Sequence, residues 1–166
     1  MPLPDGVRIR RATPDDAHAL GHLHLDVWDD AYTDLMPQSV LDERRAGVDL
    51  RVERWREILE SSDQPTWLAE DASGLVGFAG TGPARDNDIE FGEELYALYT
   101  RRRWWGTGVG YALLEAALGD RAGYLWVLAG NDRAIRFYER QGFVLDGTED
   151  EHDEGRHVRM VRAGTE

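Results

Sequence analysis

The feature that most constrains the fold is an unbroken strand–glycine turn–helix–strand segment at residues 94–129. Residues 94–100, ELYALYT, are typical of a strand, and the run GTGVG follows at 106–110. Apolar residues then recur at helical spacing, and the continuous apolar run YLWVLA at 124–129 indicates a buried strand. A strand–helix–strand unit crosses over in a right-handed sense, which predicts that its two strands are parallel.

The remaining patterns predict a mixed α/β fold that forms a single domain over residues 1–166. We expect one central sheet of about seven strands and about four flanking helices. Thr13 and Asp16, with Pro14 between them, form a pattern typical of a capping box. Further strands are expected at 7–12, 66–71, 75–82, 143–147 and 157–162, further helices at 17–30, 50–60 and 131–141, and polar connections at 83–93 and 148–155.

Composition narrows the class of protein. The chain has 166 residues, no cysteine and a net charge of −13. Without cysteine there is no disulfide framework and no thiolate metal site, and no metal is expected. The negative charge disfavours binding to nucleic acid and to anionic membranes. No signal-peptide core and no run of ~18–20 apolar residues is found, so a cytoplasmic protein is expected.

The glycine run has two interpretations. A helix N-terminus leaves backbone N–H groups unpaired and carries partial positive charge, and glycines let a ligand approach the backbone, so the run suits an anion. The same glycines can also form nothing more than a tight turn. Two known phosphate motifs are excluded, because the spacing is G-x-G-x-G and the segment contains no lysine.

A second motif downstream decides between these interpretations. Residues 131–143, NDRAIRFYERQGF, lie one strand beyond the glycine helix. Together with LYT…WGTGVGYALL and LWVLAGN, they closely resemble the GNAT superfamily of N-acetyltransferases, most strongly over residues 93–143. The resemblance implies a sheet splayed between the strands at 94–100 and 124–129. It also implies transfer of an acetyl group from acetyl-coenzyme A to a primary amine.

The resemblance assigns the acetyl-coenzyme A site to the glycine turn, the splayed strands and the next helix. In the family the pyrophosphate lies on the loop before this helix, and the pantetheine arm lies in the strand gap. Trp105 departs from the family pattern of Gln or Arg, so it offers an apolar face and an indole N–H in place of a charge. The implied contacts are Leu98, Tyr99, Thr100, Trp105, Gly106, Thr107, Gly108, Val109, Gly110, Asn131 and Tyr138.

The same resemblance implies three catalytic groups. The backbone N–H of Leu98 would stabilise the oxyanion, Tyr138 would protonate the departing thiolate, and Glu94 would deprotonate the amine directly or through a water. Each also has a plain structural interpretation: core packing for Leu98, a helix residue for Tyr138 and a solvated carboxylate for Glu94. Further candidates for the base are Asp88, Glu90, His22, His24, His152 and His157.

The absence of cysteine rules out an acetyl-cysteine intermediate, so direct attack in a ternary complex is expected. A non-catalytic coenzyme A-binding or regulatory domain on the same fold is the alternative. A structural domain whose glycines only form a turn is the third possibility.

The acceptor pocket of the family is built from the first helices, the loop before residue 94 and the last hairpin. Here these regions supply Trp28, Tyr32, Met36 and Trp67, with Glu94 and acidic loops nearby. Aromatic surface beside carboxylates suits a small or peptidyl amine of cationic type, although core aromatics and solvated loops would give the same pattern. Exposed aromatics and a late hairpin permit a homodimer, which is frequent in the family.

Overall fold

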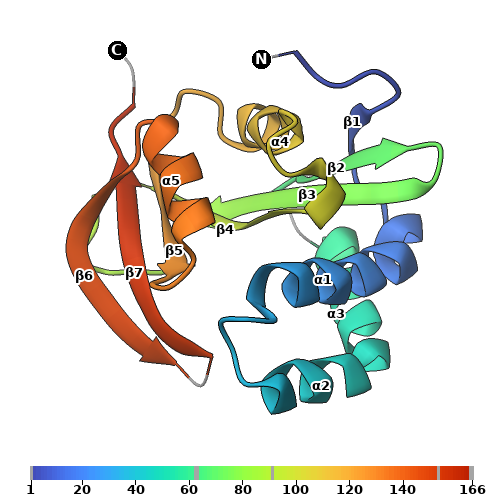
Figure 1. Ribbon diagram of the computed structural model, residues 1–166. Coiled ribbons are helices and arrows are strands. Elements are labelled where there is room, and N and C mark those ends of the chain that lie inside the picture. Colours follow the sequence, from blue (N-terminus) through green and yellow to red (C-terminus); the bar gives the residue numbers. More distant parts are fainter. Residues whose placement is uncertain (1, 62–63, 91, 153, 165–166) are drawn as a thin grey trace.

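The computed structural model describes residues 2–61, 64–90, 92–152 and 154–164. A mixed sheet of seven strands runs in the order β1-β2-β3-β4-β5-β7-β6 (Figure 1). Adjacent strands are antiparallel except β4 and β5, which are parallel as the crossover predicts. The strands are β1 (Arg8–Arg11), β2 (Thr66–Asp71), β3 (Gly74–Pro83), β4 (Glu93–Thr100), β5 (Gly123–Leu128), β6 (Val144–His152) and β7 (Gly155–Arg162).

Helices cover both faces of the sheet, with α4 and α5 on one side and α1, α2 and α3 on the other (Figure 1). α4 packs Val109 and Leu113 onto the first three strands, while α1 and α3 enclose Leu23 and Phe78 on the opposite face. No helix in the described ranges is both long and apolar enough to cross a bilayer. The helices are α1 (Ala17–Tyr32), α2 (Gln38–Ala46), α3 (Val48–Ser61), α4 (Val109–Ala117) and α5 (Asp132–Arg140), with short 3-10 turns η1 (Pro14–Asp16) and η2 (Arg102–Trp104).

The structure has one helix more than the sequence predicts. A single helix was expected at 50–60, whereas α2 and α3 follow one another between Gln38 and Ser61. α2 buries only Leu41. It therefore lacks the apolar periodicity on which the prediction of a helix depends.

The last hairpin is also longer than expected. β6 continues to His152, so residues 148–152 of the predicted acidic loop belong to a strand. Its register with β7 shifts between Leu145 and Glu149, and Gly147 has a positive φ of 87° there. β6 lies at the edge of the sheet, where charged side chains on a strand remain in solvent. The acidic run is therefore compatible with a strand.

β4 and β5 meet at one end only. Their register contains the pair Glu94 and Tyr124, and the strands separate beyond it. A bulge contributes to this separation, because Gly80 of β3 pairs with Ala97 while Thr81 pairs with Leu95. The residue between these two on β4 therefore has no partner on β3, and a bulge of this kind bends and twists its strand. The predicted splay of the sheet is confirmed.

The connection before β4 is tied to the far side of the sheet. Arg159 of β7 is 5% exposed, and its guanidinium donates to the carboxylates of Asp86, Asp88 and Asp146. Asp88, one of the further candidates for the base, is thus already paired with a cation. The predicted exposed loop is held in place by these ion pairs and borders the splayed strands.

Candidate functional site

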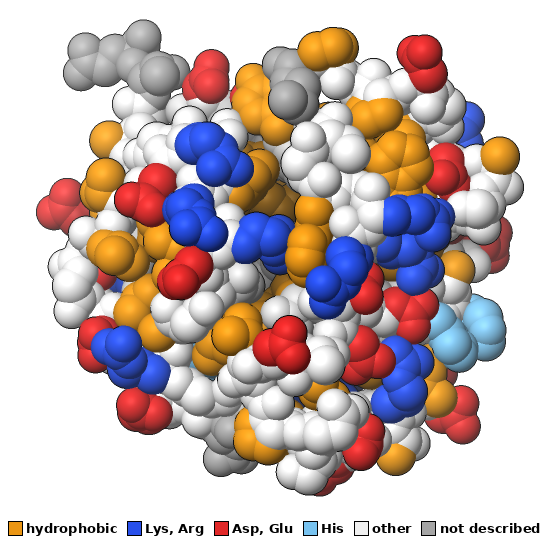
Figure 2. Space-filling view, viewed as in Figure 1, with side chains coloured by type: hydrophobic (Ala, Val, Ile, Leu, Met, Phe, Trp, Pro, Cys, Tyr) orange, Lys and Arg blue, Asp and Glu red, His pale blue; other side chains and the backbone are white. Residues whose placement is uncertain are grey.

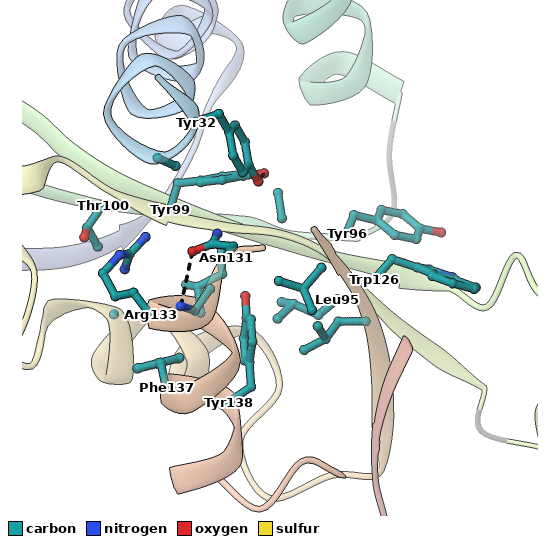
Figure 3. Close-up of a pocket in the computed structure, with 17 residues that line it drawn as sticks. Tyr32, Leu95, Tyr96, Tyr99, Thr100, Trp126, Asn131, Arg133, Phe137 and Tyr138 are labelled. Carbon is teal, nitrogen blue, oxygen red and sulfur yellow. Dashed lines mark hydrogen bonds between the residues drawn. The ribbon is translucent and has the colours of Figure 1, made fainter. Parts of the chain in front are cut away.

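A pocket lies in the gap between β4 and β5 (Figure 3). The two strands form facing walls, and α5 with the first turn of α4 closes the space between them. It is lined by Ala31, Tyr32, Leu95, Tyr96, Ala97, Leu98, Tyr99, Thr100, Gly110, Leu125, Trp126, Val127, Asn131, Arg133, Ala134, Phe137 and Tyr138. The structure therefore brings seven predicted site residues together here: Tyr32, Leu98, Tyr99, Thr100, Gly110, Asn131 and Tyr138.

The backbone of β4 presents unpaired groups to this pocket. The N–H of Arg101 donates to the carbonyl of Val76 on β3 at 2.8 Å. Hydrogen bonding alternates along an antiparallel pair, so the N–H of Tyr99 also faces β3, whereas those of Leu98 and Thr100 face β5. Because β5 has already diverged from β4 here, no strand among the described residues pairs with these two N–H groups.

Tyr138 projects from α5 into the gap, with its hydroxyl at the pocket (Figure 3). The residue is 7% exposed, and its hydroxyl makes no hydrogen bond within the described residues. Burial is the main cause that raises the pKa of Tyr138, and the neighbouring Tyr99 adds to it. The hydroxyl therefore stays protonated at neutral pH and is available as a donor.

Asn131 caps the same helix. Its side-chain oxygen accepts a hydrogen bond from the backbone N–H of Ala134 at 3.3 Å, which satisfies one of the free donors of the first turn (Figure 3). The side chain is 6% exposed and lines the pocket. A capping role and a place in the pocket wall thus coexist in this residue.

The glycine turn reaches the pocket at its last residue. Gly106 and Gly108 have positive φ values of 73° and 97°, a conformation that favours glycine. α4 starts directly afterwards, so its first N–H groups are left without helical partners at the pocket's edge. Gly110 lines the pocket, whereas Trp105, Gly106, Thr107, Gly108 and Val109 do not.

Trp105 supports a residue that does line the pocket. The guanidinium carbon of Arg133 lies 3.7 Å from the centroid of its ring, and that of Arg102 lies 4.9 Å away. The indole N–H donates to the carbonyl of Thr100 at 3.1 Å, which fixes the ring against β4. Arg133 makes no ion pair within the described ranges. Its cation is therefore free at the pocket rim, where stacking holds it in place.

Sequence reasoning missed Arg133, although it stands two residues after Asn131 in the downstream motif. Its role depends on Trp105, which is far away in the chain and close only after folding. Figure 2 shows the molecule from the same side as Figure 1, and basic side chains gather there around a hollow near the middle of the view.

Glu94 is the predicted catalytic residue that does not line the pocket. It is 2% exposed, and its carboxylate accepts a hydrogen bond from the Tyr124 hydroxyl at 2.8 Å. The Arg85 guanidinium donates to the same carboxylate at 2.6 Å, and the Arg85 backbone N–H does so at 3.2 Å. Glu94 therefore lies at the closed end of the strand gap and ties the preceding loop to the sheet.

A second cavity of about 610 Å³ lies on the opposite face of β4. It shares Tyr96, Ala97 and Tyr99 with the first pocket, so one strand separates the two spaces. Trp28, predicted for the acceptor, belongs to this second cavity. Its lining is His24, Trp28, Arg44, Arg51, Arg54, Trp55, Glu57, Ile58, Ser61, Gln64, Thr66, Gly80, Thr81, Tyr96, Ala97 and Tyr99.

The second cavity is basic, contrary to the acidic surroundings expected for the acceptor. Glu57 is the acidic residue in its described lining, and the predicted loop carboxylates do not line it. Several of them are already paired with arginines, as in Arg85 with Glu94 and Arg159 with Asp86. Met36 and Trp67 line neither space and pack into hydrophobic clusters instead. Within the described residues, no group of three or more His, Asp or Glu could hold a metal ion.

Comparison with known proteins supports one family. The model of the acetyltransferase (GNAT) domain matches residues 62–145. The probable N-acetyltransferase Rv2775 of Mycobacterium tuberculosis is 28% identical over 149 residues, which are 87% of this chain and 83% of that protein. The uncharacterized N-acetyltransferase YuaI of Bacillus subtilis is 27% identical over 165 residues, with 95% of this chain and 91% of that protein covered.

Among solved structures, the PaiA N-acetyltransferase of Thermoplasma acidophilum in complex with coenzyme A has the same fold. Its TM-score is 0.69 at 18% identity, and the match covers 96% of this chain and 99% of that one. The family model spans half of the sequence and includes the splayed strands, the glycine turn and Tyr138. The chain therefore belongs to the GNAT acetyltransferase family.

Proposed function

We propose that the protein transfers an acetyl group from acetyl-coenzyme A to a primary amine, by direct attack in a ternary complex. The observation that carries this proposal is the pocket between β4 and β5. A backbone N–H from Leu98 of β4 meets the protonated hydroxyl of Tyr138 there, and Tyr138 comes from α5, the helix that Asn131 caps. A donor group aimed at a developing oxyanion and a proton source for a leaving group are what acyl transfer requires.

The residues around the gap suit acetyl-coenzyme A. Gly106 and Gly108 open the backbone of the turn, and the first N–H groups of α4 are unpaired, which favours a pyrophosphate. Arg133 adds an unpaired cation at the rim. The free backbone groups of Leu98 and Thr100 suit the amides of an extended pantetheine arm, much as an edge strand binds a peptide. When bound, this co-substrate supplies the activated acyl group.

Two residues of the chain then assist the chemistry. The N–H of Leu98 donates to the carbonyl oxygen as negative charge develops on it. The neutral amine forms the N–C bond, the C–S bond breaks, and Tyr138 gives its proton to the sulfur that leaves. The proton that the nitrogen loses passes to solvent, from which the Tyr138 hydroxyl is restored. A free thiol has a pKa of about 8.5 and the pKa of Tyr138 is raised, so this transfer depends on positioning the hydroxyl beside the sulfur.

We assign Glu94 to holding the closed end of the gap, and not to removing the amine's proton. A general base must reach the proton that it removes, directly or through one water. The Glu94 carboxylate is occupied by donors from Arg85 and Tyr124, and it lines neither cavity. A free alkylamine has a pKa of about 10.4, so we expect turnover to rise with pH over the neutral range as the neutral amine becomes available.

The proposed activity is tested first by ligand binding and then by turnover. Coenzyme A and acetyl-coenzyme A should raise the Tm, because a ligand at 100 times its Kd adds about 2.7 kcal/mol to stability. Release of coenzyme A with a panel of primary amines should then be measurable. A raised Tm without turnover on any amine would favour a non-catalytic coenzyme A-binding domain. No change in Tm with either ligand would contradict both the transferase and the non-catalytic coenzyme A-binding domain.

Tyr138→Phe tests the general acid. Losing the hydroxyl should lower kcat by about 10²-fold and leave the affinity for coenzyme A nearly unchanged, since the ring still fills its place. Steady-state kinetics and a thermal shift with coenzyme A measure the two effects. Tyr111→Phe is the matched control, because Tyr111 does not line the pocket. An unchanged kcat in Tyr138→Phe would remove this residue from the mechanism.

Glu94→Gln tests the structural assignment. The amide replaces a buried acceptor of several donors, so the free energy of unfolding should fall by about 1–3 kcal/mol and the Tm by several degrees, while acetyl transfer persists. Glu93→Gln is the control, since Glu93 pairs with Arg121 away from the gap. If the Glu94→Gln variant instead keeps its Tm, loses activity and no longer shows a fall of turnover towards acidic pH, Glu94 is the base.

A further inference from the structure

The second cavity is placed to receive the acceptor of the proposed reaction. It meets the acetyl-coenzyme A pocket at Tyr96, Ala97 and Tyr99, next to the bulge of β4. An amine in this cavity approaches an acyl group in the first pocket from the opposite face of the same strand. Its walls from α1 and α3 include Trp28, Trp55 and Ile58, which suit an apolar body.

Three arginines give this cavity its charge. Arg44 comes from α2, and Arg51 and Arg54 come from α3. The whole chain has 32 acidic and 19 basic residues, yet Glu57 is the acidic residue in the described lining of this cavity. The same arginines also line an adjoining pocket with Glu43 and Glu154. Within the second cavity itself positive charge is in excess, which solubility does not explain in an acidic protein.

These arginines are poorly neutralised. Arg51 and Arg54 make no hydrogen bond or ion pair with any residue in the described ranges. Burial, followed by the charges of Arg44 and Arg54, lowers the pKa of Arg51. Like charges held together in this way repel one another, and an anion between them would relieve the repulsion.

Arg44 is held in position, but not all of its N–H donors have hydrogen-bond partners in the described structure. Its guanidinium carbon lies 3.5 Å from the centroid of the Trp28 ring, and its nearest carboxylate, Glu154, is 3.6 Å away. Its buried Nε has no hydrogen-bond partner in the described structure. A buried N–H without an acceptor is costly, so this guanidinium is held in place without all of its donors being paired.

A neighbouring histidine, His24, is affected by the positive charge of the same arginines. His24 lies in the cavity wall, and its Nδ1 accepts a hydrogen bond from the Trp55 indole at 3.2 Å. Burial, and then the charges of Arg51 and Arg44, lower the pKa of His24 to about 3. The imidazole is therefore neutral at physiological pH and offers a ligand a polar N–H without adding charge.

We propose that the acceptor amine carries an anionic oxygen group, a carboxylate or a phosphate, which Arg44, Arg51 and Arg54 bind in this cavity. The proposal rests on the proposed function and specifies its substrate class. Guanidinium groups bind both anions through paired N–H donors. The acceptor thus has an amine directed towards β4, an apolar body against the tryptophans and an anionic end between α2 and α3. This replaces the cationic acceptor expected from the sequence.

The test compares matched amines. Release of coenzyme A is measured with benzylamine, 4-(aminomethyl)benzoate and 4-(aminomethyl)phenylphosphonate, which share one body. The wild-type protein should prefer an anionic compound over benzylamine by at least about tenfold in kcat/KM. The better of the two anions identifies the group. A preference for benzylamine over both would overturn the proposal.

Variants connect the preference to the arginines. In Arg51→Gln/Arg54→Gln the ratio of kcat/KM between the anionic compound and benzylamine should fall towards one. Arg56→Gln, on the same helix and paired with Glu53, should keep the wild-type ratio. Replacing two mutually repelling cations should not impair folding, which is checked by the thermal shift with coenzyme A. A ratio unchanged in the double variant would contradict the proposal.

A binding measurement separates this proposal from the proposed function. With coenzyme A present, the anionic compound should raise the Tm of the wild-type protein more than benzylamine does, and the double variant should lose this difference. That result with no turnover would support the anion site while the transferase proposal fails. Equal effects of the charged and neutral compounds would overturn the anion site even if benzylamine is acetylated.

Discussion

The hydrogen bonds that β4 and β5 do not make are the constraint on which the site depends. Two parallel strands in one sheet normally pair along their length, but here the register holds only at Glu94 and Tyr124. The bulge on β4 turns the strand away, and the loop pinned by Arg159 and Arg85 keeps the paired end closed. Unpaired backbone groups of β4 therefore face the gap between the strands, where an extended ligand can make the missing hydrogen bonds.

The same strand organises two chemically different spaces. On the side of α4 and α5, the pocket offers backbone donors, a protonated tyrosine and helix N-termini, all suited to an acyl thioester with phosphate groups. On the side of α1 and α3, the cavity offers tryptophans and three arginines, of which Arg51 and Arg54 make no ion pair in the described part of the chain. The net charge of −13 does not predict the local charge of either space, because many carboxylates form ion pairs elsewhere in the protein.

The sequence predicted the parts of the site that depend on local pattern. The crossover and the cap at Asn131 follow from periodicity and residue pattern, whereas the splayed strands follow from the family resemblance that the ordered pair of motifs carries. It could not predict contacts between distant segments, such as Trp105 beneath Arg133 or Arg85 on Glu94. The basic cavity was missed for the same reason, since its arginines lie on the helix α2 that lacks an apolar stripe and on α3, and only packing brings them to β4.

Amide hydrogen exchange at β4 tests the central claim most directly. If the gap is a binding site made of backbone, the N–H groups of Leu98 and Thr100 should exchange faster than that of Tyr99 in the free protein. Addition of coenzyme A should then slow exchange at Leu98 and Thr100 and leave Tyr99, which faces β3, much as before. Strong protection of Leu98 and Thr100 without ligand, or no change on adding it, would contradict the account.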